Sequence, residues 1–427
     1  MGLGRATRGA VFQYGRGESA FWQGGLGGGR IGMPLLSARL KAPMAAVPIL
    51  CFLAGLLLLV AVLLDALETV VLPRRVRRHF GLTSWFYRLS WGPWAAIARL
   101  MPERGRREAF LGYFGPVSLI CLLALWAAGL IVGFALVQYG AGGHLNLLGT
   151  VPGFGLLLYH SGETFFTLGY GDIVPSAGFS RFLAVLEAGL GFAFLGIVVG
   201  YLPTIYSAFS RREIEIALLD ARAGSPPTAA ELLRRYCRCS TDDGLDRIFA
   251  AWERWSAEVL ESHLSYPVLS FFRSQHNNQS WLAALTTILD ATALVLVGID
   301  GMPSEQAKMT FAMARHAAVD LSQVVAATYD PHFSDRLSAD GFASLRQSLA
   351  EKGLTLSSEG DAEARLASLR AMYEPYVHAI ACRLRIALPP WMHAKKTPDN
   401  WKVAPWDDRI ANRSAGATAA YRSDDHF

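Results

Sequence analysis

The sequence has few charged residues. Asp, Glu, Lys and Arg make up 18% of the 427 residues, whereas 52% are hydrophobic. A soluble domain typically has about 25% charged residues. The hydrophobic residues are clustered, and the runs at 46–64, 114–139 and 180–209 each have roughly the 20 residues that a helix needs to cross a bilayer. The composition therefore predicts a multi-pass protein of the cell membrane, embedded in a lipid bilayer.

Cysteine is also scarce. Cys51 and Cys121 lie in hydrophobic runs, whereas Cys237, Cys239 and Cys382 lie in the polar half of the chain. This usage excludes a disulfide framework. A zinc site at Cys237 and Cys239 would need two further ligands, and no neighbouring His or Cys pair offers them. We therefore interpret the cysteines as incidental thiols and expect no cofactor.

Several functional motifs are missing. No hydrophobic run contains the arginines at every third position that a voltage sensor requires. No Gly-rich turn follows a predicted strand, so a nucleotide-binding domain of the Rossmann type is not indicated. Metal-ligand residue types occur without a nucleophile motif and are interpreted as surface polar residues, namely Asp330, His332 and Asp335, and His316 with Asp320. An enzymatic function is not expected.

The basic residues are concentrated beside the hydrophobic runs. Residues 73–113 contain nine arginines and, as acidic residues, only Glu103 and Glu108. The positive-inside rule places this loop in the cytoplasm and the N-terminus outside. Lipid headgroups account for these basic residues, so nucleic acid is not an expected partner. The aromatic and aliphatic residues of 80–100 predict a helix that lies on the inner membrane surface.

Two acidic residues, Asp65 and Glu68, lie between the first hydrophobic run and this loop. They are expected either to remain solvated at the membrane boundary or to pair with the first arginines of the loop, Arg74, Arg75, Arg77 and Arg78.

The chain after residue 212 has the pattern of a helical domain. The spacing of Thr228 to Glu231 forms a capping box at the start of a helix. Hydrophobic residues then recur at helical spacing in three segments, 245–260, 304–329 and 361–384. Residues 281–299 are apolar enough for a further span, but they contain Asp290 and lack basic flanks, so a buried core helix is expected.

The segment between the second and third hydrophobic runs carries the functional motif. Phe154–Phe166 is a hydrophobic stretch too short to cross a bilayer, and its length suits a re-entrant helix. The sequence Thr167-Leu168-Gly169-Tyr170-Gly171 follows, with alternate glycines that favour non-helical backbone. Such backbone is tolerated at membrane depth only where its carbonyl groups are buried in protein or line a wet cavity.

These carbonyl groups are expected to face ions. Four extended segments around one axis supply rings of oxygens, which replace the water shell of a monovalent cation. The negative end of the short helix dipole favours a cation in the cavity below.

The motif T-L-G-Y-G-D after a short helix, between an outer and an inner span, resembles the pore domain of prokaryotic potassium channels, in the two-transmembrane-helix ion channel superfamily. The resemblance covers residues 114–212. It implies an all-α membrane protein with an outer helix, a re-entrant pore helix with a selectivity filter, and an inner helix. An additional N-terminal transmembrane helix and a helical cytoplasmic C-terminal domain complete this fold.

The resemblance also assigns site residues. It implies K⁺ as the permeant ion, bound at Thr167, Leu168, Gly169 and Tyr170, with Gly171 completing the filter. Since the chain has one copy of the motif, it implies a homotetramer.

On this basis the chain is divided into a disordered tail (1–43), a transmembrane helix (44–72), a basic cytoplasmic loop with an interfacial helix (73–113), the pore domain (114–212), a helical cytoplasmic domain (213–390) and a second disordered tail (391–427).

The likeness to prokaryotic members extends to Glu163 and Asp172, whose spacing matches a carboxyl pair that braces the filter. Two carboxylates held close in a low-dielectric site favour a shared proton, although two independent hydrophilic residues would have the same spacing. Tyr159 and His160 stand where the family often has a Trp pair, so the packing of the pore helix is expected to differ. His160 is expected to be a buried, neutral, hydrogen-bonded histidine rather than a pH sensor.

Two residues of the inner span resemble gating elements of the family. Gly191 falls at the position of the inner-helix hinge, and Pro203 lies near the cytoplasmic end, where a kink would bring four helices together. Close helix packing explains the glycines of this span equally well.

The sequence therefore predicts a potassium-selective channel subunit. A nonselective cation channel is one alternative, and a membrane-anchored sensor whose C-terminal domain is the active part is another. The sequence does not identify a ligand or partner of that domain.

Overall fold

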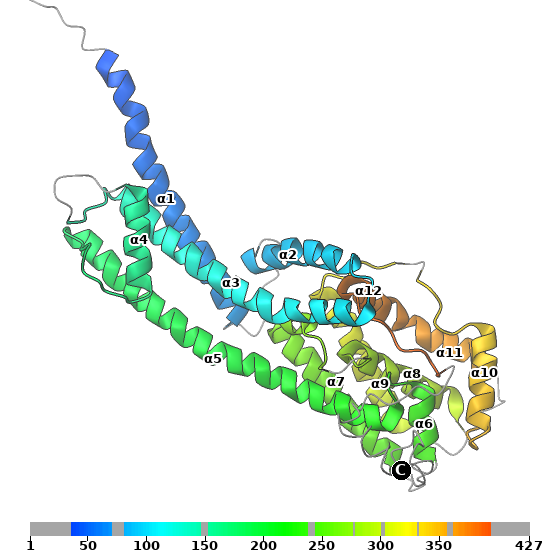
Figure 1. Cartoon of the computed structure of the whole chain (residues 1–427). Coiled ribbons are helices and arrows are strands. Elements are labelled where there is room, and N and C mark those ends of the chain that lie inside the picture. Colours follow the sequence, from blue (N-terminus) through cyan, green and yellow to red (C-terminus); the bar gives the residue numbers. More distant parts are fainter. Residues whose placement is uncertain are drawn as a thin grey trace, which may run out of the picture. The chain divides into compact units, whose positions relative to one another are not determined.

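The computed structural model describes residues 36–70, 81–146, 153–237, 244–275, 278–299, 304–330, 333–356 and 362–393. These residues are almost all helical and contain no strand, only two isolated bridges, as the expected all-α fold requires (Figure 1). Residues Met1–Val47 and Pro48–Phe427 form two compact units. Most of the two expected tails lies outside the described residues, as do the four arginines expected to pair with Asp65 and Glu68.

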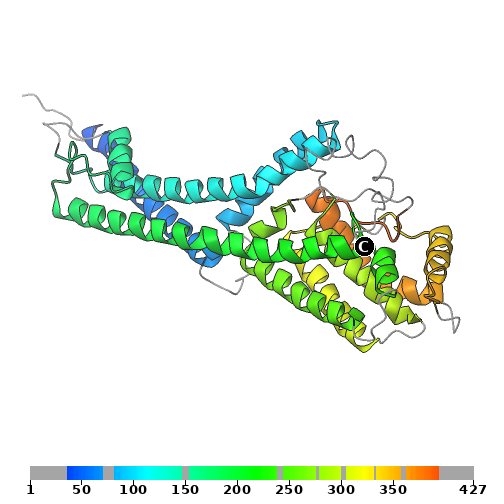
Figure 2. The same cartoon turned by 60° about the horizontal axis from the view of Figure 1, so that its bottom comes forward.

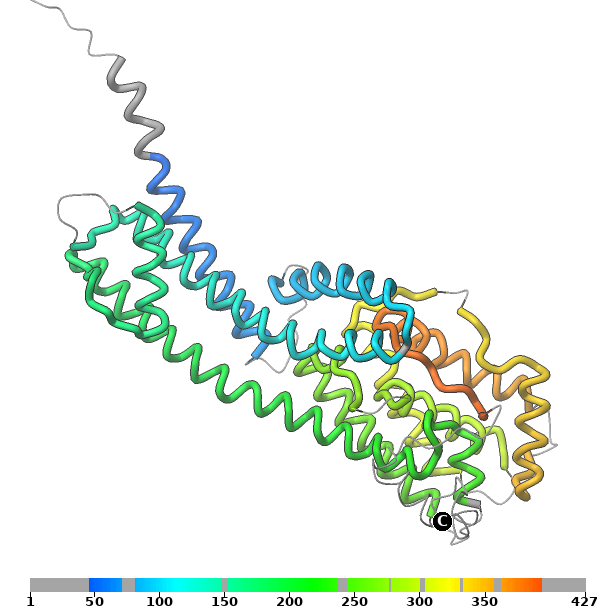
Figure 3. Tube along the Cα trace, viewed as in Figure 1, coloured from blue at the N-terminus to red at the C-terminus, as the bar shows by residue number. Residues whose placement is uncertain are grey.

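Three helices cover the predicted spans: α1 (Leu36–Val70), α3 (Arg104–Gly140) and α5 (Gly178–Ala223). Each has the length and apolar composition to cross a membrane. Both α3 and α5 are longer than the hydrophobic runs alone, because each continues as a helix beyond its run. The trace in Figure 3 follows α5 without interruption from its start, shortly after the Thr167–Gly171 segment, to the C-terminal helices.

Small residues let α1 and α3 approach closely. A Cβ atom added at Gly55 would lie 2.7 Å from the carbonyl oxygen of Gly133, and one at Gly140 would lie 2.5 Å from that of Pro48. Glycine at both positions permits the backbones to pack in a way that any side chain would block. The first transmembrane helix is therefore packed against the outer helix of the predicted pore domain.

Asp65, near the end of α1, joins α1 to two other helices. Its carboxylate accepts hydrogen bonds from the backbone N–H of Thr83 (3.1 Å), the Thr83 hydroxyl (2.6 Å) and Nε1 of Trp126 (2.9 Å). Thr83 is in the first turn of α2 (Leu82–Arg99), whose own N-cap is Gly81, a residue without a side chain to cap it. Asp65 therefore supplies, from another helix, the acceptor that the start of α2 lacks.

Helix α2 has one exposed face and one buried face. Trp85 and Leu89 are exposed, as an interfacial anchor would be. Trp91 is 3% exposed and its Nε1 donates to the carbonyl oxygen of Arg383 at 2.9 Å, so it belongs to the core of the C-terminal helices. That burial was not anticipated from the sequence, because an apolar face does not reveal whether lipid or protein covers it.

The C-terminal part of the chain is a helical domain. Its elements are α6 (Ala229–Cys237), α7 (Gly244–Ser265), the 3₁₀ helix η1 (Pro267–Phe271), α8 (Trp281–Gly298), α9 (Glu305–Val324), α10 (Ala339–Ala350), α11 (Ala362–Ala371) and α12 (Glu374–Leu384). Half of the predicted capping box is present, since Oγ1 of Thr228 accepts from the N–H of Glu231 at 3.3 Å. The Thr228 N–H donates to the carbonyl oxygen of Ala223 instead of the Glu231 carboxylate, which pairs with Arg235. The stripe at 361–384 is divided between α11 and α12.

Helix α8 lies in the core of this domain. It is long and apolar enough to span a membrane, yet 89% of it is buried by the protein itself. Its neighbours are α6, α7, α9, α11 and α12, together with the end of α5. The structure thus agrees with the expectation of a buried core helix.

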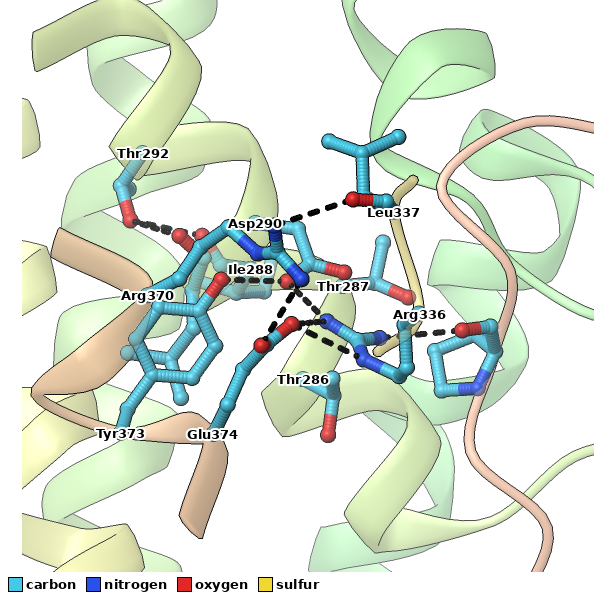
Figure 4. Close-up of polar contacts among 12 residues, drawn as sticks. Thr286, Thr287, Ile288, Asp290, Thr292, Arg336, Leu337, Arg370, Tyr373 and Glu374 are labelled. Carbon is cyan, nitrogen blue, oxygen red and sulfur yellow. Dashed lines mark hydrogen bonds and ion pairs between the residues drawn. The ribbon is translucent and has the colours of Figure 1, made fainter. Parts of the chain in front are cut away.

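A buried ionic cluster fixes Asp290 of α8 (Figure 4). Arg336 pairs with Asp290 at 2.6 Å and with Glu374 at 3.1 Å, and the Tyr373 hydroxyl donates to Asp290 at 2.6 Å. Arg370 pairs with the second oxygen of Glu374 at 3.0 Å. Each carboxylate removed from water is therefore matched by a cation or a donor, which is the condition for burying it.

Candidate functional site

The re-entrant helix is present as α4 (Phe154–Phe165). Its bounds agree with the predicted stretch to within one residue at the C-terminal end. In Figures 1 and 2, α4 lies beside α3 and α5, and it contacts both. One face is buried, with Leu157 at 0% and Phe165 at 2% exposure, while Tyr159 on another face is 43% exposed. A helix of this length is held in place by its neighbours rather than by its own stability.

The residues after α4 leave the helical conformation in an alternating pattern. Thr167, Gly169 and Gly171 have φ angles of 55°, 65° and 76°, whereas Leu168 and Tyr170 between them do not have positive φ. Glycine adopts such angles readily, but Thr167 is β-branched, and positive φ is a strained conformation for it. Strain of this kind concentrates at functional sites.

The carbonyl oxygens of this segment have no backbone partner. The N–H of Thr167 donates to Thr164 at 3.1 Å, and that of Leu168 donates to Glu163 at 2.9 Å. Within the part of the chain that the structure describes, no backbone N–H donates to a carbonyl oxygen of residues 167–171. These oxygens are therefore available to another ligand.

The large side chains of the segment are exposed in the single chain. Leu168 is 54% exposed and Tyr170 is 69% exposed. Apolar side chains of this size, in a segment expected at membrane depth, require a covering surface.

Glu163 and Asp172 differ in their surroundings. Glu163 is 6% exposed, and its Oε2 has no hydrogen-bond partner among the described residues. Asp172 is exposed and accepts from the Tyr159 hydroxyl at 3.2 Å. Among the described residues no hydrogen bond joins the two carboxyl groups, and the hydrogen-bond donor to Asp172 is Tyr159.

His160 is buried as predicted, at 4% exposure. The predicted hydrogen bond is absent among the described residues, because neither ring nitrogen has a partner there.

Gly191 lies where α5 meets the end of α4. A Cβ atom at this position would be 2.0 Å from the carbonyl oxygen of Phe165, a distance that no real Cβ contact has. The structure thus gives Gly191 a packing role. Pro203 lies inside α5, which continues through it, and Oγ1 of Thr204 donates to the carbonyl oxygen of Gly200 at 2.9 Å.

The sequence analysis missed a buried carboxyl group, Glu187 of α5. It is 0% exposed and is hydrogen-bonded to Ser161 of α4 and to Gln138 of α3. The signal was available, because an ionisable residue within a hydrophobic span is a functional hypothesis by default.

The metal-site alternatives receive no support. Among the residues that the structure describes, no three His, Cys, Asp or Glu side chains form a cluster suited to a metal. Asp335 is engaged with Arg370, and His332 lies outside the described residues. His316 and Asp320 form a surface pair 3.7 Å apart.

Comparison with known proteins finds a family match within the membrane segment. Residues 120–207 match a family described as "Ion channel". This segment is therefore similar to the pore domains of ion channels. It includes most of α3, all of α4, the 167–171 segment and the first part of α5. The channel domain occupies a minority of the chain and accounts for no part of the helical domain.

The similarity to one relative covers more residues than the family match does. The chain is 23% identical over 253 residues to "Uncharacterized membrane protein YdjJ" of Bacillus subtilis (strain 168), which covers 58% of this chain and 70% of that protein. No solved structure matches the chain. The family match, the membrane-protein relative and the apolar helices together show a multi-pass membrane protein.

Proposed function

We propose that the chain is one subunit of a homotetrameric channel that conducts K⁺ selectively and passively, with Thr167–Gly171 as its filter. The observation that supports this most strongly is the set of unpaired carbonyl oxygens along a backbone of alternating φ, at the end of a short helix in an ion-channel domain. Rings of such oxygens replace the hydration shell of K⁺.

A tetramer would account for two features of the single chain, its one filter segment and its exposed apolar side chains. One chain supplies one filter segment, so a ring of oxygens needs further copies. The exposed side chains of Leu168 and Tyr170 would then pack against neighbouring subunits. Only 17% of the most hydrophobic part of α5 is buried, which leaves it available to lipid, to a second copy or to a water-filled pore.

The roles of the surrounding residues follow from this arrangement. Glu163 and Asp172 would support the filter from behind, Asp172 through Tyr159 rather than through Glu163 directly. We assign the gating bend to Pro203, which cannot donate a backbone hydrogen bond within α5. Gly191 would hold the filter end of α4 against α5 instead of acting as a hinge.

Potassium flux into liposomes that contain the purified protein tests the proposal. We expect flux that Gly169→Ala abolishes, because φ of 65° at Gly169 is unfavourable for alanine and a side chain there redirects the filter carbonyls. The matched control is Gly178→Ala, in the first turn of α5, where a Cβ meets nothing within 4 Å and φ is not positive. A wild-type protein that passes no K⁺, or that is a stable monomer, would contradict the proposal.

A nonselective cation channel is the second candidate. The observation that favours it is the absence of a hydrogen bond between Glu163 and Asp172, since a filter with looser support discriminates less between cations. Reversal potentials in mixed K⁺ and Na⁺ solutions separate the two functions. A reversal potential that follows the K⁺ gradient supports selectivity, whereas one near zero supports the second candidate.

A further inference from the structure

Glu187 is a buried carboxyl group at the meeting point of three helices of the channel domain. It lies on α5 with 0% exposure, its Oε1 contacts Oγ of Ser161 on α4, and its Oε2 accepts from Nε2 of Gln138 on α3 at 3.4 Å. It does not belong to the segment that carries the unpaired carbonyl oxygens.

The hydrogen bonds around Ser161 require one more proton than its hydroxyl has. Oγ of Ser161 lies within hydrogen-bond distance of the Glu187 carboxyl and also 2.8 Å from the carbonyl oxygen of Ile131 on α3. A serine hydroxyl has a single proton, so it donates to one of the two acceptors. Both contacts are hydrogen bonds only if the Glu187 carboxyl supplies the second proton.

The surroundings favour the same protonation state. Among the described residues, no Lys, Arg or His side chain forms an ion pair with Glu187. An ionised carboxylate without a cation is costly within a membrane, whereas a carboxylic acid with a hydrogen-bond acceptor is far less so. A chain of donors then runs from Glu187 to Ser161 and on to Ile131.

This chain of hydrogen bonds is one half of a two-point contact between α4 and α5. Glu187 meets Ser161, and one turn further along both helices Gly191 meets Phe165. Residues four positions apart lie on the same face of a helix, so the same faces of α4 and α5 meet at both points. Phe165 is the last residue of α4, next to the filter.

We propose that Glu187, as a neutral carboxylic acid that donates to Ser161, is a positioning residue that holds the pore helix α4 between α3 and α5. The role rests on the proposed channel function, because its effect is on the position of the filter that α4 carries. Glu187 does not line the ion path; it acts through Ser161.

Single-channel recording from planar bilayers tests the role, with Glu187→Leu and Glu187→Gln compared with wild type. Leucine fills a similar volume without a donor, whereas the glutamine amide donates to Ser161 as the acid does. We expect Glu187→Leu to lower the open probability about ten-fold, the equivalent of about 1.4 kcal/mol, at unchanged unitary conductance. Glu187→Gln is expected to retain wild-type open probability within about two-fold.

Ser161→Ala removes only the hydroxyl group between Glu187 and Ile131. This variant keeps the test decisive if the Glu187→Leu protein does not assemble. We expect it to lower the open probability as Glu187→Leu does, and the double variant to be no worse than either single variant. The matched control is Glu351→Leu, on the exposed surface at the end of α10, with no expected effect. Equal open probability in wild type, Glu187→Leu and Ser161→Ala would overturn the role while leaving the channel function intact; absent wild-type current is a failure of the channel function instead.

Infrared difference spectroscopy reads the proton directly. The wild-type channel in lipid is expected to show the C=O stretching band of a protonated carboxyl group that Glu187→Gln removes and Glu351→Gln does not. A spectrum in which Glu187→Gln removes only carboxylate bands would overturn the neutral-acid assignment.

Discussion

The two halves of this chain bury their hydrophobic residues in different ways. In the helical domain, 89% of the apolar helix α8 is covered by other parts of the same chain. In the membrane part, 17% of the corresponding windows of α1 and α5 is covered. Both regions have the hydropathy of transmembrane helices, so hydropathy alone does not distinguish a helix that lipid surrounds from one that protein surrounds.

The polar groups of the two regions also differ in whether the same chain supplies their partners. The ionic cluster at Asp290 is closed within one chain, with each carboxylate paired (Figure 4). The segment Thr167–Gly171 leaves its carbonyl oxygens without backbone donors among the described residues. The carboxylates of the first region are paired within one chain, whereas the carbonyl oxygens of the second have no backbone donor among the described residues and are open to another ligand.

Breaking the ionic cluster gives the largest expected effect on the helical domain. Arg336→Ala leaves Asp290 and Glu374 buried without this cation, and we expect the free energy of unfolding to fall by about 3–5 kcal/mol. Thermal unfolding of the full chain in detergent, monitored by tryptophan fluorescence, measures the change. Arg346→Ala, on the exposed face of α10, is the control. A loss no larger than that of the control would show that the domain does not depend on the cluster.

Adding a side chain where α4 and α5 meet tests how closely these two helices of the membrane part must pack. Gly191→Ala places a Cβ against the Phe165 carbonyl, so α4 has to shift, and overpacking of this kind costs about 1–3 kcal/mol. We expect reduced K⁺ flux into liposomes and weaker assembly, measured by native mass spectrometry. Gly196→Ala, where a Cβ meets nothing within 4 Å, is the matched control. Equal flux in the two variants would mean that this contact does not position the filter.

Acidification is expected to destabilise the helical domain through His263. Burial, and secondly the nearby Arg212, lowers the pKa of His263 on α7 to about 3. Its Nδ1 lies 2.8 Å from the Val259 carbonyl oxygen and its Nε2 lies 3.2 Å from Nη1 of Arg212, so both nitrogens are satisfied only in the neutral ring. Because the unfolded chain binds this proton near pH 6.5, stability is retained above that pH and falls as the pH drops below it, by about 2 kcal/mol at pH 5.

Urea unfolding at pH 7 and pH 5 measures this loss, with His263→Phe and the exposed His316→Gln as the variants to compare. We expect the pH dependence to shrink in His263→Phe and to persist in His316→Gln. The same dependence in both variants would assign it to other groups.

The smallest expected effect is at the junction of α1 and α2. Thr83→Val removes the hydroxyl that donates to Asp65 at 2.6 Å but leaves the backbone N–H bond, so we expect a loss of about 1–2 kcal/mol. Thermal unfolding measures it, with Ser84→Ala as the neighbouring exposed control. Unchanged stability in Thr83→Val would indicate that the backbone N–H and Trp126 suffice to hold Asp65.

Local signals made several elements predictable. The bounds of α4 followed from a short apolar stretch that ends at a filter rich in glycine, and the start of α6 followed from the spacing of Thr228 to Glu231. Such features depend on neighbours in the sequence, so the sequence contains them. The multi-pass membrane character followed from composition alone.

Long-range partners were not predictable in the same way. The burial of Trp91 depends on Arg383, which is far along the chain, and the partner of Asp65 is Thr83 rather than a basic residue within the described part. The hydrogen bond of Tyr159 to Asp172 and the contact of Gly191 with Phe165 depend on how helices meet. Hydrophobic periodicity fixes the face of a helix that leaves water, but not the surface that covers it.

The unbroken length of α5 has a mechanical consequence. At 1.5 Å per residue its 46 residues form a rod about 70 Å long. Near its far end, Arg212 donates to the carbonyl oxygens of Leu269 and Phe272 at 3.0 and 2.9 Å, which clamps the rod to the short 3₁₀ segment after α7. Because no loop separates this clamp from the membrane part of α5, a displacement of the C-terminal helices reaches that part through continuous helix, with Pro203 as the one residue on the way that lacks a backbone donor.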